Sequence, residues 1–176
     1  LQAMDRGFLA GSGNDSRIEA AIANYETAYR MQSTVPELVD IRGESEATKK
    51  LYGLDDANAG KRAYAKQCLL ARRLVERGVR FIQIYSGGEE NEKSWDGHLN
   101  IEQNHRGFAG ETDQPIAGLL ADLKQRGLFD STLVVWGGEF GRLPLAQRPK
   151  NDPSRSGRDH NPHAFTTWFA GGGVKG

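Results

Sequence analysis

Two stretches of this 176-residue chain combine histidines with acidic side chains. The first, SWDGHLNIEQNH, places Asp96 two residues before His98, and the second, GRDHNPH, places Asp159 next to His160. All the histidines of the chain lie in these stretches, at His98, His105, His160 and His163. Imidazole nitrogens and carboxylate oxygens are the ligands that zinc and other divalent ions prefer in proteins. The two stretches therefore predict a divalent metal site.

A further carboxylate follows an apolar run in the sequence STLVVWGGEFGR, residues 131–142. The run predicts a buried strand over residues 132–136, and Glu139 comes directly after it among three glycines. A strand end holds a side chain rigidly, so Glu139 is a candidate ligand. The two histidine-containing loops would supply the other ligands.

Each of these residues also has an ordinary explanation. A single loop histidine is usually exposed or hydrogen-bonded, and Asp96 and Asp159 have the residue type of turns and helix caps. Glu139 could instead pair with Arg142 or Arg158. Their joint arrangement on one predicted side of a sheet favours the metal site.

Basic residues gather in the second loop. Between positions 142 and 158 a single acid, Asp152, accompanies Arg142, Arg148, Lys150, Arg155 and Arg158. On a chain whose 23 Lys and Arg balance its 23 Asp and Glu, this excess suits an anionic group such as phosphate or sulfate. A solvated loop is the alternative.

Composition argues against several classes of protein. The balanced charge gives no argument for nucleic acid, and no apolar run approaches the ~20 residues of a membrane span. The single Cys68 excludes an intrachain disulfide framework and a cysteine-rich zinc site. No G-x-S-x-G motif is present, and nothing pairs Ser86 with a histidine, so Ser–His–Asp chemistry fits poorly.

Helical periodicity predicts the elements that would position these residues. Helices are expected over residues 15–32, 58–78 and 113–127. A capping box at Thr34 predicts a further short helix that starts there. Cys68 falls on the apolar face of the helix over residues 58–78, which predicts a core position.

Short apolar runs predict strands over residues 79–86, 132–136 and 164–170. Since a helix, a glycine and a strand occur twice in that order, we expect an α/β fold with a largely parallel β-sheet flanked by helices. Residues 1–176 are expected to form one domain, with a helical segment over 1–60 and an α/β segment over 61–176. The long loops 86–110 and 141–163 would leave the carboxyl ends of strands, where such sheets bind ligands.

Three motifs resemble the alkaline phosphatase and sulfatase superfamily. TLVVWGGEFGR looks like the strand that ends in its T-x-D-H metal-binding turn, WDGH is similar to an upstream Asp–His pair, and HNPHAFTTWFAGGGV looks like its last metal histidine and following strand. The whole chain looks closest to bacterial sulfatase-like proteins of unassigned function. The resemblance implies the C-terminal portion of an alkaline phosphatase-like domain and favours an exported or periplasmic location.

The resemblance also implies roles for particular residues. The implied metal ligands are Asp96, His98, Glu139 and His160. Phe140 stands where the superfamily has a histidine, and further candidate ligands are His105, Asp159 and His163. The expected ion is zinc, with calcium and manganese as alternatives, and the expected anion-binding residues are Arg142 and Arg158.

The expected activity is metal-dependent hydrolysis of a sulfate or phosphate ester on a small molecule or glycan. The resemblance places the nucleophile in polypeptide outside residues 1–176. A non-catalytic metal- or anion-binding domain of the same fold, and a phosphodiesterase or mutase of the same superfamily, are the alternatives.

Overall fold

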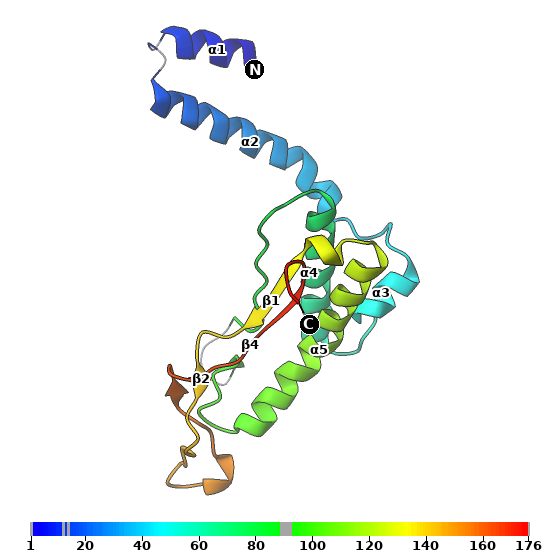
Figure 1. The fold of residues 1–176 in the computed structure, drawn as a ribbon. Coiled ribbons are helices and arrows are strands. Elements are labelled where there is room, and N and C mark those ends of the chain that lie inside the picture. Colours follow the sequence, from blue (N-terminus) through cyan, green and yellow to red (C-terminus); the bar gives the residue numbers. More distant parts are fainter. Residues whose placement is uncertain (1, 12, 14, 89–92, 176) are drawn as a thin grey trace. The chain divides into compact units, whose positions relative to one another are not determined.

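The computed structural model describes residues 2–11, 13, 15–88 and 93–175 (Figure 1). The chain divides into two compact units, Leu1–Gly43 and Glu44–Gly176. The helices are α1 (Gln2–Gly11), α2 (Ser16–Val39), α3 (Glu46–Tyr52), α4 (Ala59–Glu76) and α5 (Ile101–Gln125), with 3₁₀ turns η2 (Phe129–Ser131) and η3 (Pro153–Arg155). The strands are β1 (Leu133–Gly137), β2 (Gly141–Arg142), β3 (His160–Asn161) and β4 (Thr167–Gly171).

The first unit contains α1 and α2. The carboxylate of Asp15 accepts the amide proton of Arg17 at 2.8 Å and caps α2, at the start of the helix expected from residue 15. The separate helix predicted from Thr34 is wrong, because α2 continues through Pro36 to Val39. A proline this close to the carboxyl end removes one helical hydrogen bond without ending the helix.

The second unit has its core where α3, α4 and α5 pack together (Figure 1). The predicted helix over residues 58–78 is confirmed, and Cys68 is fully buried on it. Other buried apolar side chains of the described residues include Tyr52, Ala65, Leu69, Ala71, Pro115, Leu119 and Leu123. At Gly118 of α5 an added Cβ would lie 2.8 Å from the carbonyl oxygen of Leu51, so the missing side chain allows α3 to approach closely.

A buried ionic network ties these helices together. Arg72 is only 2 % exposed, and its guanidinium lies 2.7 Å from Glu44, 2.6 Å from Glu76 and 2.9 Å from Asp122. The hydroxyl of Tyr52 donates to Asp122 at 3.0 Å. Because a buried charge is costly unless it is paired, removal of one partner should destabilise the core.

Glu44 carries an acid-sensitive part of this network. Burial by itself raises the pKa of its carboxyl group, but hydrogen bonds from Arg73 and Arg72 outweigh burial and hold the pKa below its usual value. A carboxyl group with a lowered folded-state pKa stabilises the fold above its unfolded-state pKa. That stability is lost as the pH falls through the folded-state value.

We expect Glu44→Gln to lower the free energy of unfolding by about 1–3 kcal/mol at pH 7, because Arg72 and Arg73 lose their shared counter-charge. We also expect its stability to fall less steeply than that of the wild type below about pH 4.3. Urea unfolding at a series of pH values measures both. Glu46→Gln is the matched control, because Glu46 pairs with Lys49 at the surface. Parallel pH curves for wild type and Glu44→Gln would contradict the assignment.

The strands form two separate antiparallel pairs, β1 with β4 and β2 with β3. The predicted largely parallel, helix-flanked sheet and the alkaline phosphatase-like fold are therefore wrong. The segment between β1 and β4 turns back through the β2–β3 pair, which brings β4 alongside β1 in the opposite direction (Figure 1). Apolar periodicity predicts strands but does not fix their relative direction.

The apolar strand sequences are also less buried than predicted. Leu133, Val135 and Phe169 in the β1–β4 pair are each more than half exposed. Residues 79–86, predicted as a strand, are not assigned to one, and Phe81 is 82 % exposed. No helix among the described residues is long and apolar enough to cross a membrane.

Candidate metal centre

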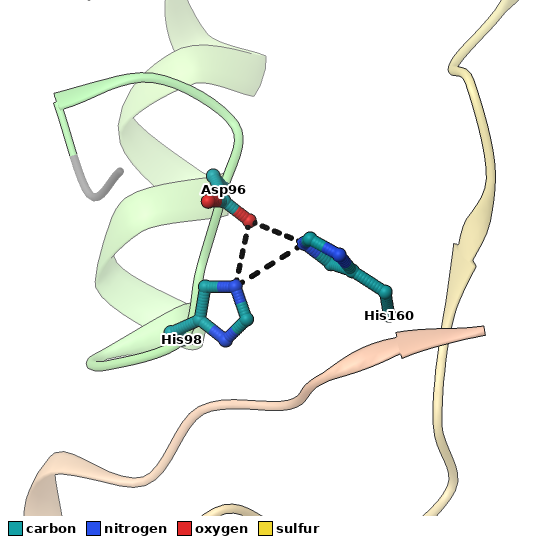
Figure 2. Close-up of side chains that lie close together, drawn as sticks. All are labelled: Asp96, His98 and His160. Atoms are coloured by element: carbon teal, nitrogen blue, oxygen red, sulfur yellow. Dashed lines mark hydrogen bonds and ion pairs between the residues drawn. The ribbon is translucent and has the colours of Figure 1, made fainter. Parts of the chain in front are cut away.

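Asp96, His98 and His160 converge on one point (Figure 2). Oδ1 of Asp96 lies 3.1 Å from Nε2 of His98 and 2.9 Å from Nε2 of His160. The two Nε2 atoms are 3.2 Å apart. Three ligand atoms from two distant parts of the sequence thus form a nearly equilateral triangle.

The size of this triangle fits a small divalent ion. Zinc binds histidine nitrogen and carboxylate oxygen at about 2.0–2.2 Å. Atoms separated by 2.9, 3.1 and 3.2 Å are close enough for all three to lie at that distance from one ion. The three side chains would together hold such an ion, and three protein ligands are the number found in catalytic zinc sites.

The turn that carries Asp96 and His98 is anchored on α5. The ring of Trp95 packs against His105 and Phe108 of that helix, with centroids 5.6 and 5.4 Å apart. Its indole N–H donates to Ser86 at 2.9 Å, and Asn104 donates to the carbonyl of Ser94 at 2.7 Å. This packing fixes the position of the turn.

The predicted first loop is shorter than the sequence indicates, because α5 begins at Ile101 rather than near residue 113. His105 therefore lies in a helix and not in a loop. Its Nε2–H donates to the carbonyl oxygen of Trp95 at 3.3 Å.

The second loop docks on the first through backbone hydrogen bonds. The amide of Arg158 donates to the carbonyl of Gly97 at 3.1 Å, and the amide of Ile101 donates to the backbone carbonyl of Ser156 at 3.2 Å. At the buried Gly157, a Cβ would overlap the carbonyl group of His98. This close approach requires glycine.

Strand pairing then brings His160 to the site. β2 pairs with β3 so that Arg142 faces His160. The Arg142 guanidinium donates to Oδ1 of Asp96 at 2.6 Å and to the carbonyl of Arg158 at 3.0 Å. Phe140 stands where the resemblance implied a histidine. Its ring packs on the ring of His160, with centroids 4.3 Å apart, and so supports this candidate ligand.

The charges around Asp96 keep it ionised. Partial burial raises the pKa of its carboxyl group, but hydrogen bonds from His160 and Arg142 and the positive charge of Arg142 hold that pKa below its usual value. An ionised carboxylate is the form that binds a metal.

The remaining predicted site residues lie outside this group. Among the described residues, the group of converging ligand atoms does not include those of Glu139, His105, Asp159 or His163. Asp159 comes nearest in the contacts observed, with Oδ1 3.9 Å from Nδ1 of His98. The guanidinium of Arg158 donates to the carbonyl of Leu143 at 3.1 Å.

One neighbour of the site was not predicted. Oε1 of Gln147 lies 3.0 Å from Nδ1 of His98. The residue lies in the loop over residues 141–163, where the basic side chains are the features that the sequence pattern makes evident. A glutamine in a loop has no pattern that would single it out.

Residues 1–176 match the family described as a protein of unknown function, DUF1501. The chain therefore belongs to this family. No curated protein and no solved structure matches it.

These comparisons correct the resemblance to the alkaline phosphatase and sulfatase superfamily. The family that matches is DUF1501 over the whole chain, and no sulfatase or alkaline phosphatase family matches. The motifs that carried the resemblance are short, and the antiparallel strand pairs differ from the sheet that it implied.

We expect Gly157→Ala to separate the two loops, because the new methyl group would overlap the backbone of His98. The cost should be about 1–3 kcal/mol. Hydrogen exchange at the amides of Ile101 and Arg158, which bond across the loops, measures the loss. Gly138→Ala is the matched control, since its Cβ would meet nothing closer than 3.8 Å. Unchanged protection at both amides in Gly157→Ala would contradict this account.

Proposed function

We propose that Asp96, His98 and His160 bind a catalytic divalent ion, zinc in the first instance, and that the protein hydrolyses phosphate or sulfate esters. The single observation that carries the proposal is the convergence of the three ligand atoms within 3.2 Å of one another. Two histidines and one carboxylate are a common set of protein ligands for catalytic zinc.

The charge of the site supports an anionic substrate. One carboxylate, Asp96, stands against the guanidinium of Arg142 at 2.6 Å. A bound divalent ion would therefore leave the site with a net positive charge. Phosphate and sulfate esters are anions that such a site attracts.

The chemistry divides between the ion and the chain. A bound divalent ion supplies Lewis-acid stabilisation of charge on a phosphoryl or sulfuryl oxygen. The two imidazoles and Asp96 hold the ion, and Arg142 holds Asp96 in place and ionised. With the side chain of His160 40 % exposed, a substrate can reach the site from solvent.

We expect the protein to bind one zinc ion per chain, and His98→Ala or His160→Ala to weaken its affinity more than about 100-fold. Competition with a chromophoric chelator measures the affinity, and elemental analysis of the purified protein measures the content. His163→Ala is the matched control, because His163 lies outside the group of converging ligands. Retention of metal by the His98→Ala/His160→Ala double variant would refute the site. Metal loss in His163→Ala alone would also contradict it.

We expect the metal-loaded protein to hydrolyse 4-nitrophenyl phosphate or 4-nitrophenyl sulfate. Dialysis against a chelator should abolish turnover, and added zinc should restore it, because the ion stabilises the charge that develops. Release of 4-nitrophenolate measures the rate, with Asp96→Asn as the inactive variant. Turnover that survives both the chelator and Asp96→Asn would contradict the proposal. Stoichiometric iron in place of zinc, with no hydrolysis of either ester, would also contradict it.

A further inference from the structure

The ring of His98 makes a contact on the side away from the three converging atoms. Its Nδ1 lies 3.0 Å from Oε1 of Gln147. A glutamine carbonyl oxygen can only accept a hydrogen bond, so the proton of this bond belongs to His98. In the neutral imidazole, Nε2 then carries a lone pair and no proton.

That lone pair faces the other two ligand atoms. Nε2 of His98 lies 3.1 Å from Oδ1 of Asp96 and 3.2 Å from Nε2 of His160. With the proton of His98 at Nδ1, the atoms of Asp96 and His98 that face each other are both acceptors. A cation between them would convert this repulsion into binding.

The backbone of Gln147 is held by the same docking that forms the site. Its amide donates to the carbonyl of Gly157 at 2.8 Å and its carbonyl accepts from Gly157 at 3.0 Å. Gly157 in turn lies against the backbone of His98. These backbone contacts fix the position of Gln147 relative to the ring of His98.

The nearest alternative acceptor is Asp159, whose Oδ1 lies 3.9 Å from the same Nδ1. That distance is too long for a hydrogen bond. The residue in contact is therefore a neutral amide, which fixes the ring without adding negative charge. A neutral partner preserves the positive charge that would attract an anionic ester.

We propose that Gln147 is a positioning residue that holds His98 as the Nδ1–H tautomer and directs Nε2 at the metal. This inference rests on the proposed function, because it assigns the outer partner of one of the proposed ligands. Outer partners of this kind typically alter metal affinity by 10- to 100-fold.

The test compares Gln147→Leu, which removes the acceptor, with Gln147→Glu, which keeps an acceptor at the same position. Histidine ¹⁵N chemical shifts of the metal-free protein report which nitrogen of His98 carries the proton. We expect the Nδ1–H form in the wild type and in Gln147→Glu, and the Nε2–H form in Gln147→Leu. Zinc affinity should fall about 10- to 100-fold in Gln147→Leu and stay within about threefold of the wild type in Gln147→Glu.

Two further variants keep the result decisive. Gln103→Leu makes the same substitution at an exposed position of α5 and should change neither readout. Asp159→Asn should keep the Nδ1–H tautomer, since Gln147 remains in contact. If Asp159→Asn shifts the tautomer and Gln147→Leu does not, Asp159 is the partner and the assignment is overturned. An unchanged tautomer and unchanged affinity in Gln147→Leu overturn it as well.

Failure of the proposed function gives a different result. If the wild type binds no zinc, the metal assignment fails, while the tautomer measurement on metal-free protein still decides the contact of Gln147. If zinc binds and both Gln147 variants lose affinity equally with no change of tautomer, the residue acts only through folding and the inference is overturned.

Discussion

Backbone hydrogen bonds between two loops hold the candidate metal centre together. The amides of Arg158 and Ile101 bond across from one loop to the other, and Gly157 lets the two backbones come close enough to do so. The positions of Asp96, His98 and His160 all depend on this docking. Since backbone groups bond at fixed lengths and angles, they define the site more tightly than flexible side chains would. The candidate ligands thus lie on a turn and on the short strand β3, and the relative position of the two is defined by these bonds.

The same chain uses charge differently in its core and at its surface site. Around Arg72 the guanidinium has three carboxylate partners, so the buried charge is paired, and loss of a partner should destabilise the packing of α3, α4 and α5. Around Asp96 one carboxylate faces a guanidinium and two imidazoles, and the site is partly open to solvent. The imidazole nitrogens and the carboxylate are suited to a cation. Because the site has little negative charge, a bound cation would leave it positive and able to attract an anion, as proposed above.

Helices were the most predictable part of the fold. The apolar stripe around Cys68 and the cap at Asp15 are local signals, because they involve residues within a few turns of one another. The errors concern the boundaries of helices and the pairing of strands. The helix predicted from Thr34 is a continuation of α2, α5 begins earlier than its apolar stripe indicates, and residues 79–86 are not assigned to a strand. Short apolar runs show neither direction nor partner, so the parallel sheet was a weak inference.

By itself the sequence determined which side chains could bind a metal and that most of them lie in two stretches separated by a helical and a strand pattern. It also determined the helical core, because period and capping are properties of consecutive residues. Only the tertiary structure decided that Asp96, His98 and His160 meet while Glu139 stays apart, and that Gln147 contacts the ring of His98. Those outcomes depend on how the second loop docks on the first. That docking comes from hydrogen bonds between backbone groups, which no side-chain pattern indicates, and from the close approach that Gly157 allows.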